Sequence, residues 1–446
     1  MSKITKLAGN FGRLWSRGHE NFDPNTRRIL SVKGKGATTY LQGLITSDLL
    51  NSPVPPLEED EEVGGVDNDN TSANNLVEFS DKLRATCFLD NKGRILTDGL
   101  LWKIDDEEYY IDVAGDSADL LLGHLKQFVL RRSKVKVTDA SNAMAAHVVF
   151  GTLNASSPPN GYLAGVDPRH PSLGMRVLSL PKTEEEAGQS PSFEQMMSSQ
   201  FPSVPGTYNV VRKLAGVAEG SELLGKVAGE SNQEFLNAVS FQKGCYLGQE
   251  LTARVQYTGV IRKRILPIMI CDLNLQIPQP WLIASHYQNS ISNKNSSSSD
   301  EEGAMAIDDE TGPRLPRMSP SAAGGLVGIM SSGGDGSIGE REEQEQLRAQ
   351  SEALLEGLQS IQRGDKIVES KDGKTIGQVI ATPEEGTNVL LAQMRLDRVG
   401  LLGDKGVWSH TNKITIGDND NLLRYLPYLP LWWPEIDVNT GKAKEV

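Results

Sequence analysis

The chain has 446 residues, with 45 Lys and Arg against 58 Asp and Glu and a formal net charge of −13. This length allows two or three domains with separate cores, while a hydrophobic content of 38% is low for a compact enzyme and indicates disordered insertions. The acidic excess lies in residues 58–70 and 287–360, so the composition of the remainder does not favour binding to nucleic acid.

The chain has three widely spaced cysteines, Cys87, Cys245 and Cys271. An odd number at such spacing argues against a disulfide framework and indicates a reducing compartment. No C-x-x-C pair occurs, so the chain alone cannot complete a four-thiolate iron–sulfur site. No run of 18 apolar residues occurs, and we therefore predict no membrane span.

The first 19 residues contain four basic residues and no acidic residue. Their apolar residues recur at helical spacing on one face, which is typical of a targeting segment. Serine is scarce, which favours the mitochondrion over the plastid. We assign residues 1–22 to this transit segment, with an N-terminal helix that docks on the core as the alternative.

Residues 23–258 combine strand–helix–strand units with hairpins, which predicts an α+β region rather than a doubly wound parallel sheet. Strands are expected at residues 27–33, 85–89, 95–104, 109–113, 133–139 and 147–150. One helix should carry Ala37, Tyr40, Leu41 and Leu44. A second should be capped by Asp116 or Ser117 and bury Leu121, Leu125 and Phe128. Residues 51–75 are rich in Pro, Asp, Glu and Asn and are expected to be a disordered insertion.

A β-barrel-like domain is expected over residues 259–286 and 361–435. Its strands should cover residues 260–272, 365–369, 375–381 and 388–396, with Asp372-Gly373 as a hairpin turn. Residues 287–360 form a low-complexity insertion that we expect to be disordered up to residue 338 and to end in a helix at 340–361. Trp432 and Trp433 should pack on the folded body.

Residues 241–254 gather a thiol, a cation, two glycines, an aromatic ring, an amide and a carboxylate. Burial of so many polar groups is costly, which favours a functional loop over a core segment. Cys245 should lie just before a helix that begins at Gln249, and Lys243 is two residues away. Both features lower the pKa of a cysteine and so favour the thiolate over the thiol. The segment predicts a reactive or metal-ligating cysteine, and a structural cysteine in a turn is the alternative.

The octapeptide Lys243-Gly244-Cys245-Tyr246-Leu247-Gly248-Gln249-Glu250 resembles the K-G-C-F/Y-x-G-Q-E signature of the folate-binding YgfZ proteins and their mitochondrial iron–sulfur cluster assembly relatives. These proteins are distantly related to the glycine-cleavage T-protein, an aminomethyltransferase. Further stretches that resemble the family occur in its order at residues 41–48, 91–94, 167–169, 174–176 and 259–264. The resemblance implies a T-protein-like folate-binding α+β region followed by a C-terminal β-barrel-like domain.

The resemblance also implies a function. We expect an iron–sulfur cluster assembly factor of the mitochondrial matrix that acts with A-type scaffold proteins and helps to form [4Fe-4S] clusters in client enzymes. Cys245 would then supply one thiolate to a [2Fe-2S] cluster shared with the scaffold, or act as a redox thiol. The alternatives are a tetrahydrofolate-dependent aminomethyl or one-carbon transferase and, third, a folate-binding module without catalysis. Catalysis by a Cys–His pair is disfavoured, because none of the six histidines lies in a recognisable cysteine-hydrolase setting.

A cleft for tetrahydrofolate is a further implication of the resemblance. Lys243 and Arg254 are candidates for its anionic tail, Tyr246 for the pterin ring and Glu250 for the pterin donors. The other candidate residues for this cleft are Gln42, Thr46, Arg94, Arg176 and Gln249. Structural alternatives remain open, namely a bond between Glu250 and Arg254 across one helical turn, a packed Tyr246 ring and a solvent-exposed Arg94 at the hairpin.

Overall fold

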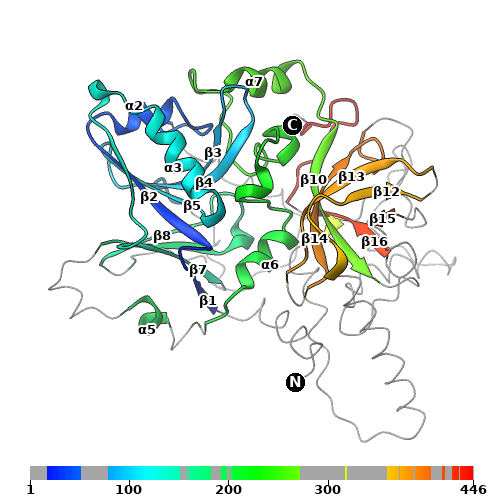
Figure 1. The fold of residues 1–446 in the computed structure, drawn as a ribbon, viewed down its shortest axis with the longest axis horizontal. Helices are drawn as coiled ribbons and strands as arrows, with labels where there is room; N and C mark the ends of the chain where they lie inside the picture. Colours follow the sequence, from blue (N-terminus) through cyan, green and yellow to red (C-terminus); the bar gives the residue numbers. More distant parts are fainter. Residues whose placement is uncertain are drawn as a thin grey trace, which may run out of the picture. The chain divides into compact units, whose positions relative to one another are not determined.

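The chain divides into two compact units (Figure 1). The N-terminal unit comprises Arg17–Ser203 and Gln233–Gln249, and the C-terminal unit comprises Val204–Asn232 and Glu250–Val446. The computed structural model describes residues 18–51, 79–150, 158, 160–181, 192–197, 201, 203–271, 317–318, 359–370, 372–384, 387–402, 414–416, 424–430 and 432–444.

The larger sheet of the N-terminal unit has five antiparallel strands in the order β3-β4-β5-β2-β6. The strands are β2 (Arg27–Lys33), β3 (Leu83–Leu89), β4 (Ile95–Lys103), β5 (Glu108–Ala114) and β6 (Lys136–Asp139). The first four match the expected strands to within two residues. The strand expected at 133–139 begins only at β6, because the 3-10 turn η3 (Arg131–Ser133) precedes it.

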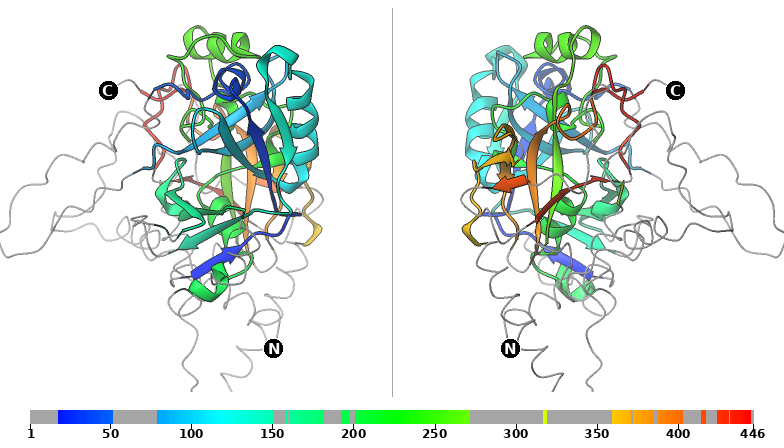
Figure 2. Two further views of the ribbon diagram at one scale, coloured as in Figure 1. Left: turned by 90° about the vertical axis from the view of Figure 1, so that its left-hand side faces the viewer. Right: turned by 90° about the vertical axis from the view of Figure 1, so that its right-hand side faces the viewer.

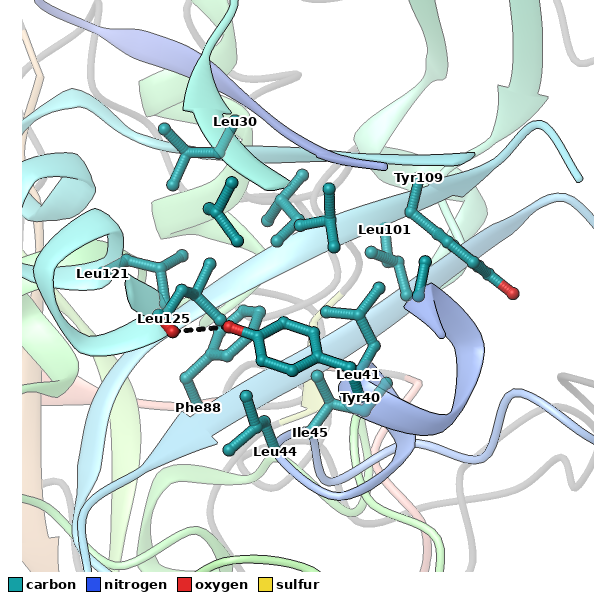
Figure 3. Packing of buried hydrophobic residues seen from close by; sticks show 14 of the residues in the cluster. Leu30, Tyr40, Leu41, Leu44, Ile45, Phe88, Leu101, Tyr109, Leu121 and Leu125 are labelled. Atoms are coloured by element: carbon teal, nitrogen blue, oxygen red, sulfur yellow. Dashed lines mark hydrogen bonds between the residues drawn. The ribbon is translucent and has the colours of Figure 1, made fainter. Parts of the chain in front are cut away.

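Two helices, α2 (Ala37–Gln42) and α3 (Ala118–Gln127), pack against this sheet. The turned views show α3, in cyan, beside β2, in blue (Figure 2). Their apolar side chains form one core with those of the strands, and the Tyr40 hydroxyl donates to the Leu125 carbonyl in its middle (Figure 3). The expected apolar faces are confirmed except at Phe128, which follows α3 and is 37% exposed. Ser117 is the N-cap residue of α3 but makes no side-chain capping bond.

A second sheet in this unit has four antiparallel strands in the order β1-β7-β9-β8. They are β1 (Gly18–Asn21), β7 (Ala145–Phe150), β8 (Tyr162–Val166) and β9 (Met175–Ser179), and the short elements of the unit are η2 (Gly115–Ser117), η4 (Pro171–Leu173) and α5 (Phe193–Met197). Residues 18–21 are therefore part of a sheet, whereas the expected transit segment extended to residue 22. The basic amphipathic helix expected before them lies outside the described residues.

The C-terminal unit is built on a six-stranded antiparallel sheet in the order β15-β12-β13-β14-β10-β16. The strands are β10 (Lys263–Cys271), β12 (Lys366–Glu369), β13 (Thr375–Ala381), β14 (Val389–Arg395), β15 (Ile414–Ile416) and β16 (Arg424–Pro427). The edge strands β15 and β16 are neighbours, so the sheet is nearly closed, as expected for a barrel-like domain. The predicted hairpin between β12 and β13 is confirmed, with Gly373 at a φ of 65°.

The remaining elements of the C-terminal unit are α6 (Thr207–Leu214), η5 (Gly220–Leu223), η6 (Gly229–Ser231), β11 (Arg317–Met318), β17 (Leu429–Pro430) and most of α7 (Gln249–Tyr257). Helix α6 contacts β14 and η6 contacts β10. The segment Val204–Asn232 therefore clusters with the C-terminal strands, whereas the expected domain boundary was at residue 258. The expected packing of the tryptophan pair is confirmed, because Trp433 is buried and the Trp432 indole donates to the Ala215 carbonyl.

Most of the two expected insertions lies outside the described residues. Within the second, Arg317–Met318 pairs in parallel with Leu429–Pro430, so these two residues are ordered where we expected disorder. Of the helix expected at 340–361, the structure describes residues 359–361, of which 359–360 are helical and Ile361 is not. None of the helices in the described ranges has the length and apolar character that crossing a bilayer requires.

Candidate functional site

Cys245 is an exposed, free cysteine on the loop that leads into α7. The residues on either side of it are attached to the body of the N-terminal unit. Two positions earlier, the Lys243 side chain is buried beneath the loop, since only 6% of the residue is exposed. Two positions later, the Leu247 backbone N–H donates to the Gly43 carbonyl at 2.9 Å. The thiol is thus presented to solvent from a loop that is held at both ends.

The Lys243 ammonium is the anchor before the cysteine. Its three hydrogens match three carbonyl acceptors, those of Gln42, Ile45 and Ser47, at 2.7–2.8 Å. Burial lowers the pKa of Lys243 to about 8, while the Asp48 carboxylate acts in the opposite direction, so the side chain remains an ammonium at neutral pH. All three donors of Lys243 are directed to backbone carbonyls of residues 42–47, which we call the α2 segment, and not to an anionic tail. The predicted effect of its charge on the thiolate stays a prediction.

Gly248 is the anchor after the cysteine. Its φ is +79°, and a Cβ at this position would lie 2.6 Å from the Asp90 carbonyl oxygen and 2.9 Å from the Gly93 Cα. The loop therefore lies directly against the β3–β4 hairpin, which only glycine allows. Gly244, beside the thiol, faces open space, because a Cβ added there would meet no heavy atom of the described residues within 4 Å.

These two glycines make a testable pair. We expect Gly248→Ala to lower the free energy of unfolding by about 2–4 kcal/mol, because it combines a left-handed backbone with a clash against the hairpin. Gly244→Ala should change it by less than about 0.5 kcal/mol. Urea denaturation of both variants measures the difference. Equal effects of the two substitutions would contradict the loop packing described above.

Tyr246 and Gln249 complete the loop. The Tyr246 ring is buried with the Lys243 ammonium 4.8 Å from its centroid, so the packed-ring alternative is confirmed. The Gln249 side-chain amide reaches back to the Gly244 carbonyl at 3.5 Å, and its backbone N–H donates to the Tyr246 carbonyl at 3.2 Å. Helix α7 begins at Gln249, as predicted. Both residues thus shape the segment that carries Cys245.

Gln42 and Thr46 do not lie on one helix as expected, because α2 ends at Gln42. The Gln42 amide donates to the Asp48 carboxylate at 2.8 Å and accepts the Leu49 N–H at 2.9 Å. Thr46 is fully buried, where its hydroxyl donates to the Ala238 carbonyl at 2.5 Å. Both side chains therefore hold the α2 segment in place, and this is the segment whose carbonyls bind Lys243.

Arg176 lies in a buried network of six charged side chains within the N-terminal unit. Its Nε is 3.1 Å from Asp167 Oδ2, and its Nη1 is 4.0 Å from Asp112 Oδ2. Asp167 also binds Arg169 at 2.8 Å. The other two members are Arg27, 2.5 Å from Asp112, and Asp98, 3.6 Å from Arg169.

The three arginines of this network balance the charge of its three aspartates. The candidate Arg176 therefore belongs to the core of the unit. Sequence reasoning missed Asp98 and Asp112, because their partners are far away along the chain.

The three remaining candidate residues are solvent-exposed. Arg94 follows the turn between β3 and β4, where its backbone N–H donates to the Asp90 carboxylate. Glu250 and Arg254 are exposed on α7 and belong to the C-terminal unit. No ionic partner of either α7 side chain is found among the described residues. Their role in ligand binding stays a prediction.

The exposed Cys245 differs from Cys87, which is buried on β3. The Cys87 thiol donates to the Gln233 side-chain oxygen at 3.1 Å, and burial raises its pKa well above the usual value. Cys87 is therefore a core residue. Within the described ranges, no group of three or more His, Cys, Asp and Glu side chains is arranged to hold a metal ion. Cys245 can therefore bind metal only in company with ligands from another molecule or from outside these ranges.

Comparison with known proteins identifies related sequences. The chain is 33% identical over 255 residues to the mitochondrial iron–sulfur cluster assembly factor IBA57 homolog of Pyricularia oryzae, a match that covers 55% of this chain and 56% of that protein. It is 32% identical over 271 and 273 residues to the proteins of the same name from Aspergillus oryzae and Aspergillus fumigatus. The chain thus matches about half the length of these relatives. No protein-family model matches it.

The fold is similar to that of the glycine cleavage system aminomethyltransferase T from Bartonella henselae. The TM-score is 0.52 over 98% of this chain and 91% of that one, at 8% sequence identity. This confirms the expected T-protein-like fold. The relatives named above confirm the resemblance to mitochondrial iron–sulfur cluster assembly factors, and their names support the predicted mitochondrial location.

Proposed function

We propose that this chain is an assembly factor for iron–sulfur clusters in the mitochondrial matrix and that Cys245 is its functional thiol. The observation that carries the proposal is the geometry of the loop: Cys245 is exposed, and its neighbours Lys243 and Leu247 are bonded to the α2 segment. A thiol fixed in this way can meet a ligand without the cost of ordering a mobile loop. The names of the sequence relatives are consistent with this role.

A single thiolate is an incomplete ligand set. Iron–sulfur clusters are held by several thiolates, and of the two cysteines whose exposure the structure describes, Cys245 is exposed and Cys87 is buried. The partner must therefore supply the other ligands, and an A-type scaffold that carries a [2Fe-2S] cluster is the partner we propose. The cluster is cargo in this scheme, and [4Fe-4S] enzymes are the proposed recipients.

The T-protein-like fold supports a second part of the proposal, a cleft for tetrahydrofolate. The residues nominated from the sequence do not fit that ligand as a set. Lys243, Thr46 and Arg176 are buried and bonded within the protein, and Gln42 is bonded to Asp48. We therefore assign no step of the assembly function to folate. Titration calorimetry with tetrahydrofolate tests the cleft independently of Cys245.

The central experiment mixes the purified protein anaerobically with an A-type scaffold carrying a [2Fe-2S] cluster. Visible absorption and size-exclusion chromatography then report a coloured complex. We expect the complex with the wild type and its loss in Cys245→Ser, because serine removes the soft ligand at nearly the same size. Cys87→Ser is the matched control, since Cys87 is a thiol enclosed in the core of the same unit; that variant should retain the complex.

Two outcomes would overturn the proposal that Cys245 shares a cluster with the scaffold. One is a complex that forms equally well with Cys245→Ser. The other is that neither the wild type nor Cys245→Ser forms a complex with the scaffold. The second outcome would establish the transferase alternative if the protein also released a one-carbon unit from an aminomethyl donor in a tetrahydrofolate-dependent reaction. The fold similarity to an aminomethyltransferase favours this alternative.

A further inference from the structure

Two histidines lie side by side under α5 in the N-terminal unit, where the function proposed above does not use them. In the register of β1 with β7, His19 is opposite Val149 and His147 is opposite Asn21. The two histidines are therefore diagonal neighbours on the same face of the sheet, a spacing that long side chains can bridge. His19 is 0% exposed and His147 is 6% exposed. Figure 1 shows β1, β7 and α5 in the same part of this unit.

The hydrogen bonds of the two rings define their tautomers. His147 Nδ1 is 2.8 Å from the Asn21 side-chain oxygen, and His19 Nδ1 is 2.6 Å from the Phe201 carbonyl oxygen. Both oxygens are acceptors, so each Nδ1 carries the hydrogen and each Nε2 carries a lone pair. Both Nε2 atoms are buried and have no hydrogen-bond partner among the described residues. A buried acceptor without a partner costs about 1–3 kcal/mol, and here two of them occur together.

This arrangement is that of metal-binding imidazoles, which usually donate their second ring N–H to a carbonyl or carboxylate oxygen. Metal coordination requires an Nε2 lone pair without a proton, and the Nδ1 hydrogen bonds of both rings leave each Nε2 in that form. Asn21 and Phe201 hold the rings in the necessary tautomer.

The surroundings of the pair are apolar and contain soft sulfur atoms. Phe193 of α5 stacks on His147 with ring centroids 4.1 Å apart and meets His19 edge-on at 5.6 Å. Three methionines pack in the same small core around Phe193: Met175, Met196 and Met197. Met175 is opposite Val149 in the sheet, and so lies on the face that carries both histidines. Imidazole and thioether are ligands that suit Cu(I), which is a soft ion.

We infer that His19 and His147 form a buried site for a soft monovalent metal ion, Cu(I), coordinated through both Nε2 atoms with a methionine thioether of the same core. A four-coordinate zinc site is disfavoured, because the described residues offer no third His, Cys, Asp or Glu ligand there. This site is independent of Cys245 and of the cluster-assembly function. Bound metal would link β1 to β7 across the sheet face.

The test is an anaerobic Cu(I) titration against a chromophoric chelator, with the full chain in a Cys245→Ser background that removes the exposed thiol. We expect one equivalent of Cu(I) to bind. His19→Gln and His147→Gln should each weaken the binding at least about tenfold. Met175→Leu, which keeps the size of the side chain, should weaken it if this thioether is the third ligand, and Met196→Leu and Met197→Leu test the other two.

His124→Gln is the matched control. His124 is another partly buried histidine of the same unit, on α3, and its ring packs edge-on against Phe128. This variant should bind Cu(I) as the background protein does. Because a histidine variant can also misfold, long-range 1H–15N NMR of the unsubstituted imidazoles provides a second readout, in which the Nε2 resonances of His19 and His147 should shift on addition of Cu(I).

Three outcomes would overturn the inference. The first is the absence of Cu(I) binding in the Cys245→Ser background. The second is binding that both histidine variants retain unchanged. The third is bound Cu(I) that leaves both Nε2 resonances unmoved.

Discussion

Replacement of Lys243 by Met should lower the free energy of unfolding by roughly 2–4 kcal/mol and release the loop that carries Cys245. The ammonium binds the carbonyls of Gln42, Ile45 and Ser47, and hydrogen bonds to a charged group contribute about 1.5–3 kcal/mol each before the cost of burying the charge. Methionine fills a similar volume but offers no donor, so three carbonyls lose their shared partner. Urea denaturation measures the change.

The Lys243→Met variant distinguishes the role of Lys243 in holding the loop from the role of the Cys245 thiol in binding the cluster. Lys243→Met keeps Cys245, and we therefore expect it to form the scaffold complex more weakly than the wild type, whereas Cys245→Ser should lose the complex altogether. Lys243→Arg should rescue only part of the stability, because a planar guanidinium cannot direct three donors to three converging carbonyls. Lys92→Met, at an exposed position of the β3–β4 turn, is the matched control and should be neutral. Full stability of Lys243→Met would show that the carbonyl contacts do not anchor the loop.

Asp167→Asn should destabilise the N-terminal unit by about 3–5 kcal/mol, the largest effect that we predict. The substitution removes the negative charge between Arg169 and Arg176, and two buried guanidinium groups then lack an anionic partner there. The matched control is Asp139→Asn. Asp139 pairs with Arg28 at the surface, with 31% of its side chain exposed, and its loss should cost about 1 kcal/mol or less. A thermal or urea unfolding series on both variants measures the contrast, which would vanish if burial of the network were unimportant.

Asp167 also makes stability depend on pH. Burial opposes ionisation of this carboxyl, but the charges and hydrogen bonds of Arg169 and Arg176 outweigh burial and lower the pKa of Asp167 below its ordinary value. Because the folded-state pKa is below the unfolded value of about 3.9, the stabilisation is present above that pH and is lost as the pH falls through the folded-state pKa. We expect the wild type to lose stability more steeply than Asp167→Asn on acidification below about pH 4. Parallel curves for the two proteins would contradict this assignment.

Local patterns were enough to identify the functional segment of this protein. The start of α7 at Gln249 follows from neighbours along the chain. The bounds expected from the sequence match β2 to the residue and β4 to within one residue at its end, and the resemblance carried by residues 243–250 led to the same relatives as the full comparison. All of these features depend on spacings of a few residues, which the sequence displays directly.

The tertiary structure alone decided what the charged side chains of the site do. Lys243 binds carbonyls about 200 residues earlier in the chain, and Arg176 binds Asp167 and Asp112 in the core. Both look in the sequence like cations available to a ligand, because burial depends on which distant segments pack together. His19 and His147 likewise become neighbours only when β1 pairs with β7 across more than a hundred residues. Short-range spacing determines where an element begins and ends, whereas the partner of a buried charge or lone pair is determined by how the sheets assemble.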